Sequence, residues 1–409
     1  MRRNMIITLQ NWMKEENRKP FYMTGIKGSG KTYLACEFAR SFFDSYLYLG
    51  FENNKELAKS LESVEEEHLL EVLGEYFELP AEYLLTIPFV FDEVHLCPGL
   101  ISKLLHVVGT MPLYWIFVSS FDTLSEDEKK QLSYHILYPV QFDEFLAAIG
   151  KDWYIEVITA HYRNKKRLPD MVHRELLSTF DEYLWIGGMP DAINEYLNME
   201  SSVNVTERQS IQKLILLHGM QQMTEDRTGF KCRQIYSTLD EQLLKENQKF
   251  QFNLIRKGAT YQMYKDALEF LVQHHMLYRL ESMEKEQQFK LFYPDFSLNK
   301  SARNDELTAV ERHIRLENYL CQTFQMKNFE FHFWEAKSQA CIDFVLKDKN
   351  GEYTPVELKQ EKKSKSKSIL SFRKYHPNTK NIIRISSDNF VENDEFFNIP
   401  LYSIFCIEN

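Results

Sequence analysis

The stretch that decides the fold is Gly25-Ile26-Lys27-Gly28-Ser29-Gly30-Lys31-Thr32, which follows a short apolar run at residues 21–23. It matches the P-loop pattern G-x-x-x-x-G-K-[ST] in full. The glycines let backbone N–H groups turn inward around a phosphate, the lysine reaches the β and γ phosphates, and the threonine hydroxyl binds Mg²⁺. The sequence therefore predicts an ATP and Mg²⁺ site between a strand and a helix at residues 33–42. The expected ATP contacts are Gly25, Gly28, Ser29, Gly30, Lys31 and Thr32, with Lys31 also acting on the reacting phosphate.

Two acids, Asp92 and Glu93, close a second apolar run at residues 87–91. This run predicts a strand that is buried on both faces. An acid at the carboxyl end of a parallel strand lies on the same sheet edge as the P-loop. We therefore expect Asp92 to hold Mg²⁺ together with Thr32, and Glu93 to orient the attacking water as a catalytic residue. The alternative is an ordinary strand end with solvated acids.

Composition limits the classes of protein. The 409 residues carry a net charge of −10, with 44% apolar and 26% charged residues, which predicts two to four globular domains. No apolar run approaches the about 18 residues of a membrane span, and no targeting signal opens the chain, so we expect a cytoplasmic protein without membrane contact. The six cysteines form no C-x-x-C pair, which predicts reduced thiols. The acidic balance excludes a uniformly basic surface but not a local basic face.

The order of patterns along the chain predicts four parts. The middle of the chain has two amphipathic helices, residues 238–246 and 261–274, followed by two short strands, residues 277–280 and 289–292. This is the outline of a winged helix, for which DNA contact and protein–protein packing are the alternatives. The expected parts are a parallel α/β P-loop domain (1–150), a helical lid region (151–235), a winged-helix-like domain (236–300) and a C-terminal α/β domain (301–409).

A group of acids and a lysine marks the last part. Asp343 opens a predicted strand, and Glu357 and Lys359 are two residues apart on the next strand, so they point to one face. Acids that hold a metal beside a lysine are what a Mg²⁺-dependent phosphodiesterase needs. Glu317, on an upstream helix, adds a carboxylate. We therefore expect Glu317, Asp343 and Glu357 as metal ligands, with Glu357 and Lys359 catalytic; a hairpin with solvated charges is the alternative.

A basic run follows this group. Seven cations beside a phosphodiester site would attract a DNA backbone, so DNA is an expected partner of this run and of the winged-helix region. A solvated lysine-rich loop is the alternative. The cations are Lys359, Lys362, Lys363, Lys365, Lys367, Arg373 and Lys374.

The chain resembles a bacterial and archaeal family of AAA-type ATPases in which a P-loop domain is joined through a helical and winged-helix region to a PD-(D/E)XK nuclease-like domain. The resemblance covers nearly the whole length. It implies that Ser120, after the apolar run at residues 113–118, senses the γ-phosphate, with a serine-rich turn as the alternative. It also implies a nuclease-like active site of Glu317, Asp343, Glu357 and Lys359. The motifs that carry it are the P-loop, residues 91–95 (Phe-Asp-Glu-Val-His), 138–146 (Tyr-Pro-Val-Gln-Phe-Asp-Glu-Phe-Leu), 187–190 (Gly-Gly-Met-Pro), 317–318 (Glu-Asn), 342–344 (Ile-Asp-Phe) and 356–359 (Val-Glu-Leu-Lys).

Three departures from the family pattern affect the expected function. His95 stands where the family has Gln, Ser119 replaces the Gly before the sensor Ser, and Cys341 replaces an acid two residues before Asp343. The candidates for an arginine finger are Arg163, Arg167 and Arg227.

Two functions fit this sequence. One is an ATPase whose nucleotide state controls a DNA-binding, nuclease-like domain. The other is a nucleotide-dependent switch or scaffold whose C-terminal domain binds a partner without cutting. A homo-oligomer or a partner protein is expected in either case.

Overall fold

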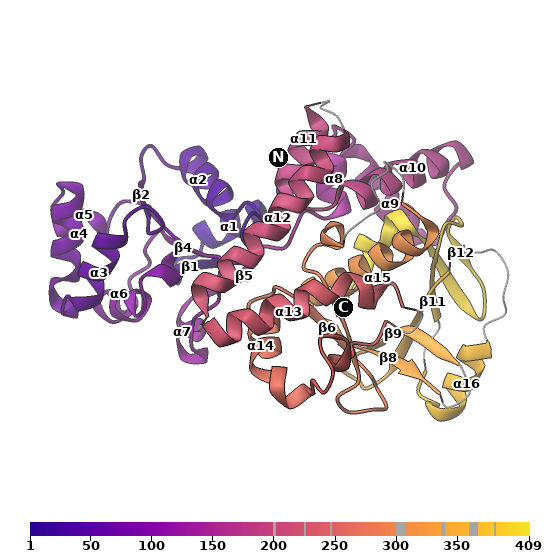
Figure 1. Ribbon diagram of the computed structural model, residues 1–409. Coiled ribbons are helices and arrows are strands. Elements are labelled where there is room, and N and C mark those ends of the chain that lie inside the picture. The colour runs from indigo at the N-terminus through magenta and orange to yellow at the C-terminus, as the bar shows by residue number, and fades with distance from the viewer. Residues whose placement is uncertain are drawn as a thin grey trace. The chain divides into compact units, whose positions relative to one another are not determined.

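The computed structural model describes residues 1–198, 202–224, 226–245, 248–299, 307–336, 340–359, 367–379 and 382–409. The chain forms two compact units, Met1–Tyr138 and Pro139–Asn409, which are described separately (Figure 1). Within the described ranges, no helix combines the length and the hydropathy that crossing a bilayer requires. The expected divisions at residues 150, 235 and 300 stay predictions.

The first unit is built on a five-stranded sheet with the order β2-β3-β4-β1-β5, in which every pair of neighbours is parallel. All residues of β1, β3 and β4 are buried, which explains why these segments read as continuous apolar runs. The prediction of a parallel α/β fold is therefore confirmed. The strands are β1 (Phe21–Thr24), β2 (Leu47–Gly50), β3 (Phe89–Asp92), β4 (Trp115–Ser119) and β5 (Ser133–Ile136).

Helices pack on both faces of this sheet. Alternate residues of a strand point to opposite faces, so Val90 packs with α1 and α2 while Phe89 and Phe91 pack with α3, α4 and α6. Figure 1 shows these two groups of helices flanking the strands. The helices are α1 (Met5–Met13), α2 (Lys31–Phe42), α3 (Lys55–Ser63), α4 (Leu69–Phe77), α5 (Ala81–Leu84), α6 (Leu100–Val108) and α7 (Glu126–Gln131).

Gly25 marks the point where the chain leaves β1 for the P-loop. Its φ is +142°, and a Cβ there would lie 2.4 Å from the carbonyl oxygen of Leu137, just beyond β5. Glycine is therefore required by the close approach of two backbones as well as by its conformation. This contact sets the path by which the P-loop reaches α2.

We expect Gly25→Ala to lower the free energy of unfolding by about 3 kcal/mol, because the new methyl group meets backbone that cannot yield. Gly99→Ala is the matched control, since Gly99 also has a positive φ, +76°, but has open space around its Cβ position. The control should cost about 1 to 2 kcal/mol, the conformational penalty alone. Urea unfolding measures both, and equal losses would contradict the assigned clash.

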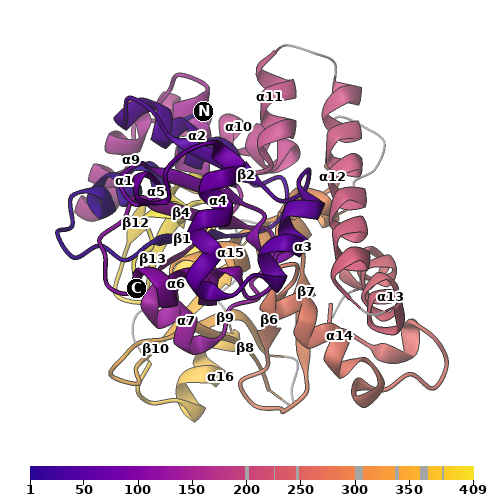
Figure 2. The ribbon, with the colours of Figure 1, turned by 90° about the vertical axis from the view of Figure 1, so that its left-hand side faces the viewer.

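The second unit begins with helices. Figure 2 shows α11 and α12 lying side by side. The turn at residues 187–190 joins α10 to α11, and its Gly188 N–H donates to Asp295 Oδ2 at 2.8 Å. The helices are α8 (Phe142–Ala148), α9 (Trp153–Asn164), α10 (Asp170–Ile186), α11 (Pro190–Leu197), α12 (Ser202–Met223), α13 (Asp226–Leu243) and α14 (Tyr261–Gln273).

The segment expected to be a winged helix keeps the predicted order of elements. The helix expected at residues 238–246 is only the end of α13, which begins at Asp226, and α14 follows it. The antiparallel strands β6 (Tyr278–Glu281) and β7 (Phe289–Phe292) come next. The assignment of this segment as a winged helix stays a prediction.

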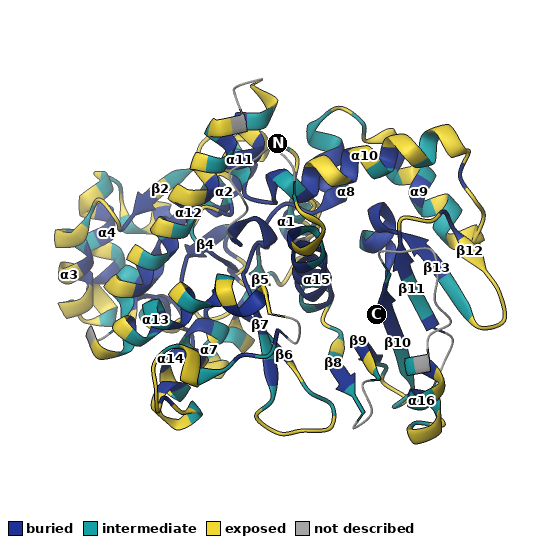
Figure 3. Cartoon of the chain, turned by 45° about the vertical axis from the view of Figure 1, so that its right-hand side comes forward, coloured by how far each residue is buried: buried dark blue, intermediate teal, exposed yellow. Residues whose placement is uncertain are grey.

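The chain ends in a six-stranded mixed sheet with the order β12-β13-β11-β10-β9-β8. The predicted antiparallel hairpins are present, because β8 pairs with β9 and β9 with β10. Helix α15 covers one face, where Phe324 contacts Phe344, and α16 covers the other, where Phe372 contacts Tyr353. Figure 3 shows that α15 is buried along most of its length. The elements are α15 (Ala309–Met326), β8 (Glu330–Glu335), β9 (Cys341–Lys347), β10 (Tyr353–Leu358), α16 (Lys367–Tyr375), β11 (Ile382–Ser386), β12 (Val391–Glu392) and β13 (Phe396–Pro400).

Candidate functional site

The P-loop connects the end of β1 to the start of α2. Its three glycines, Gly25, Gly28 and Gly30, have φ values of +142°, +89° and +92°. Such angles turn backbone N–H groups to the inside of the loop, and the first turn of α2 adds the positive end of its dipole. The loop therefore has the form of an anion-binding site.

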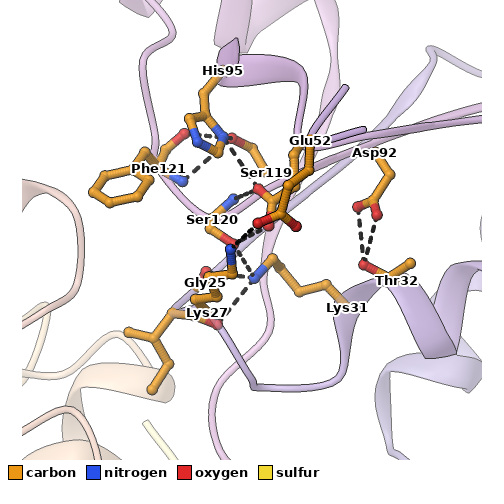
Figure 4. Close-up of polar contacts among 12 residues, drawn as sticks. Gly25, Lys27, Lys31, Thr32, Glu52, Asp92, His95, Ser119, Ser120 and Phe121 are labelled. Carbon is orange, nitrogen blue, oxygen red and sulfur yellow. Dashed lines mark hydrogen bonds and ion pairs between the residues drawn. The ribbon is translucent and has the colours of Figure 1, made fainter. Parts of the chain in front are cut away.

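Lys31, the first residue of α2, is 4% exposed and points back into the loop (Figure 4). Its Nζ donates to the carbonyl oxygens of Gly25 at 2.8 Å and Ile26 at 3.0 Å, and to Ser120 Oγ at 3.1 Å. Burial lowers the pKa of Lys31 to about 8, against the opposing effect of the Glu93 and Asp92 charges. A phosphate at this place would favour the charged ammonium.

Thr32 and Asp92 lie together, as the spacing of their motifs predicts. Thr32 Oγ1 donates to Asp92 Oδ1 at 2.9 Å and lies 3.0 Å from Oδ2. Tyr48 on β2 donates its phenol hydroxyl to the same Oδ2 at 2.9 Å. Burial and the charge of Glu93 raise the pKa of Asp92. A hydroxyl and a carboxylate in contact are oxygen ligands of the type that Mg²⁺ prefers, so these two side chains fit the ion that the P-loop implies.

Glu93 follows β3 with a φ of +55°, an uncommon conformation for a residue with a side chain. Its Oε2 accepts from the Ser120 N–H at 2.9 Å, and its Oε1 accepts from Ser120 Oγ at 2.6 Å. His95 Nδ1 lies 3.2 Å from Glu93 Oε2 and 3.1 Å from Ser119 Oγ. Burial alone would raise the pKa of Glu93, but the His95 hydrogen bond and the Lys31 charge together lower it to about 2. Glu93 is therefore ionised at neutral pH.

Two further residues of the site, Arg3 and Tyr48, belong to no sequence motif. Arg3 is buried, and its guanidinium donates to the carbonyl oxygen of Ser29 at 2.9 Å and to that of Tyr138. It thus ties the P-loop to the segment that follows β5. Sequence reasoning missed Arg3 and Tyr48, because both reach the site only through the order of the strands and the path of the N-terminal segment.

Of the three predicted acids of the second unit, Glu317 and Asp343 line one cavity and Glu357 does not. The alternation in β10 puts Glu357 on the same face as Tyr353, which contacts Phe372 of α16. There, Glu357 Oε2 lies 3.7 Å from Arg384 Nη2 and 4.0 Å from Lys359 Nζ. Asp343 instead lines a cavity on the α15 side, together with Glu317 and Leu358.

A register shift explains this difference. His332 pairs with Val345 and Trp334 with Ile342, so β9 has one more residue than β8 over this stretch. A bulge of this kind turns consecutive residues towards one side. The expectation that Asp343 and Glu357 share a face is therefore corrected. In the described part of the chain, no three His, Cys, Asp or Glu side chains form a group that could hold a metal ion.

The basic run and the arginine finger candidates are the remaining predicted residues. Lys362, Lys363 and Lys365 lie outside the described residues. Arg373 and Lys374 belong to α16. The arginine finger candidates are all exposed residues of the second unit, so that role stays a prediction for Arg163, Arg167 and Arg227.

Three family models match parts of the chain. Residues 17–146 match the model described as an AAA domain, which confirms the AAA-type part of the resemblance. Residues 177–307 and 314–404 match domains of unknown function, DUF8612 and DUF4143. The nuclease-like assignment therefore stays a prediction. No curated protein matches the chain.

Three solved structures are similar to this chain at low identity. The RuvB Holliday junction branch migration motor of Thermotoga maritima is 16% identical, with a TM-score of 0.29, over 68% of this chain and 88% of RuvB. The ORC1 protein of Aeropyrum pernix, solved in complex with DNA, is 10% identical, with a TM-score of 0.31, over 77% of this chain and 90% of ORC1. A signal transduction ATPase (STAND protein) of Pyrococcus horikoshii with a tetratricopeptide repeat sensor is 13% identical, with a TM-score of 0.28. The match covers 78% of this chain and 47% of the STAND protein.

We expect Arg3→Gln to lower the free energy of unfolding by about 3 kcal/mol and to weaken ATP binding, because two buried carbonyl groups lose a charged donor. Arg2→Gln is the matched control, since its neighbour Arg2 is exposed. Thermal unfolding and a fluorescent ATP analogue measure the two effects. Equal behaviour of the two variants would contradict the role given to Arg3.

Proposed function

We propose that the first unit, which contains the AAA-type domain at residues 17–146, binds ATP with Mg²⁺ and hydrolyses it. The observation that carries the proposal is a continuous polar group at one edge of the sheet. Lys31, Ser120 and Glu93 are joined by hydrogen bonds, and Thr32 contacts Asp92 beside them. Together they supply the cation, the metal ligands and the water-orienting acid that phosphoryl transfer requires.

Each residue then has a defined task in hydrolysis. Lys31 supplies positive charge to the β and γ phosphates, which are stronger partners for an ammonium than the carbonyl groups that hold it in the free protein. Thr32 and Asp92 would hold Mg²⁺, which neutralises charge on the phosphate oxygens when it is bound. The P-loop N–H groups orient the phosphates.

Glu93 orients the attacking water by accepting its hydrogen bond. A carboxylate whose pKa is about 2 in the free protein is a weak base, but a loose transition state needs the water to be positioned more than deprotonated. Ser120 is a positioning residue, because its hydroxyl donates to Glu93 and accepts from Lys31. A γ-phosphate that draws Lys31 away would change this bridge, which is how Ser120 would sense it.

For the second unit we propose a nucleotide-dependent switch or scaffold role, in which this unit binds a partner protein without cutting nucleic acid. The separation of Glu357 from Asp343 on opposite faces of the sheet supports this role, because a two-carboxylate metal site needs both acids on one side. DNA binding through the winged-helix-like segment or the lysine-rich run is the alternative. A steep fall in affinity with salt would identify it.

Lys31→Ala should abolish ATP binding, because the phosphates lose their main side-chain cation. Equilibrium binding of a fluorescent ATP analogue measures this, and circular dichroism checks that the variant is folded. An unchanged affinity in the folded variant would remove the nucleotide assignment.

Glu93→Gln should retain ATP binding and lose hydrolysis by roughly 10² to 10⁴ fold, because the amide is neutral and has one acceptor oxygen where the carboxylate has two. Glu75→Gln, which changes an exposed glutamate of α4, is the control and should hydrolyse ATP at the wild-type rate. Phosphate release measures both rates. Wild-type turnover by the Glu93 variant would point to another residue.

A further inference from the structure

A buried lysine contacts Glu317 in the cavity that Glu317 and Asp343 both line. Lys290 on β7 has a side chain that is 12% exposed, and its Nζ lies 2.5 Å from Oε1 of Glu317, whose side chain is 1% exposed. The same ammonium donates to Gln248 Oε1 at 3.2 Å. Burial would lower the pKa of Lys290, but the charges of Glu317 and Asp343 raise it above its ordinary value. The ion pair with Glu317 favours the charged form of Lys290.

Asp343 belongs to the same electrostatic group. Burial and the charge of Glu317 raise its pKa, whereas the charge of Lys290 lowers it. Asp343, Glu317, Lys290 and His313 line one cavity of about 640 Å³. His313 Nε2 lies 3.9 Å from Glu317 Oε2, and this oxygen is buried and has no hydrogen-bond partner within the described ranges. Glu317 thus contacts the ammonium through Oε1 and keeps acceptor capacity on Oε2, while Asp343 Oδ2 accepts from the Leu358 N–H at 2.9 Å.

The chemistry of this group does not suit a divalent metal ion. Mg²⁺ takes six oxygen ligands in near-ideal octahedral geometry, usually several of them waters. Here Glu357 lies on the other face, and Cys341 stands where a third acid is expected. Of the acids that line the cavity, Glu335 is paired with Lys249 and Glu317 with Lys290. A metal ion could approach the pair only by displacing a buried lysine of like charge.

Asn318, the residue after Glu317, also binds the segment around β7. Asn318 Oδ1 accepts from the Tyr293 N–H at 3.0 Å, and its Nδ2 donates to the Tyr293 carbonyl at 2.8 Å. Both side chains therefore bind the segment around β7: Glu317 contacts the side chain of Lys290, and Asn318 contacts the backbone of Tyr293. The Glu-Asn motif thus attaches this segment to α15 by hydrogen bonds and an ion pair.

We propose that Lys290 is the resident cation of the Glu317 and Asp343 pair, so that the second unit excludes divalent metal there and uses these acids to fix β7 against α15 and β9. The inference does not depend on ATP hydrolysis by the first unit. It makes the acids a part of the fold and removes them from phosphodiester chemistry.

Mn²⁺ binding to the full-length chain, measured by electron paramagnetic resonance and by thermal unfolding without nucleotide, tests this proposal. All proteins carry Asp92→Asn, which removes the metal ligand of the first unit. The parent should not bind Mn²⁺ through Asp343. Lys290→Met should gain a site, and Mn²⁺ at 100 times its dissociation constant should then raise the folding equilibrium constant about 100-fold. Adding Asp343→Asn should abolish the gain.

Lys213→Met is the matched control, because Lys213 pairs with the single carboxylate of Asp240, which does not line this cavity. This control should gain no Mn²⁺ site. Mn²⁺ binding by the parent that Asp343→Asn removes would overturn the proposal, and so would a folded Lys290→Met variant without Mn²⁺ binding.

Lys290→Met could also fail to fold, because it leaves buried acids uncompensated. In that case Lys290→Met combined with Glu317→Gln should restore folding, since it removes the excess charge. The control is Lys290→Met combined with Leu214→Ala, which changes an exposed residue outside the cavity and should not restore folding. If both double variants fail to fold alike, charge pairing is not what Lys290 supplies.

Discussion

The polar group at the sheet edge exists because β4 pairs in parallel with β1 on one side and with β3 on the other. Parallel pairing brings the carboxyl ends of all three strands to one edge. The P-loop follows β1, Ser120 follows β4, and the acid pair at residues 92–93 stands at the end of β3. These groups are up to 95 residues apart in the sequence, so the order of the strands is what brings them into contact. Without this pairing, Lys31, Ser120 and Glu93 would not be in contact.

Buried charge then determines how tightly this edge is organised. Lys31, Asp92 and Glu93 are 4%, 6% and 8% exposed, so each needs a partner to offset its lost hydration. Ser120 connects the cation to Glu93, and Thr32 and Tyr48 satisfy Asp92. The protein thus holds its ligand-binding groups in place with the same hydrogen bonds that stabilise their burial. Such preorganisation reduces the rearrangement that a nucleotide has to bring about.

Local patterns predicted the first site well because its chemistry is local. The P-loop occupies consecutive residues, and the apolar runs before Asp92 and Ser119 match buried strands. Arg3 and Tyr48 were missed because their contacts depend on which strands are neighbours. The shared face of Asp343 and Glu357 was wrongly expected because alternation holds only in a regular strand, and β9 contains one extra residue.

The second unit shows how a motif of acids can serve packing. Glu317 and Asn318 hold β7 through Lys290 and Tyr293, and Lys249 adds an ion pair to Glu335 on β8. The N–H of Met283, just beyond β6, also donates to the Phe333 carbonyl at 2.9 Å. Buried ion pairs often add little net stability, but removing one partner is costly because the other charge stays buried. These pairs therefore fix one arrangement of the β6–β7 segment on the terminal sheet, and a shift in that arrangement would have to break several of them together.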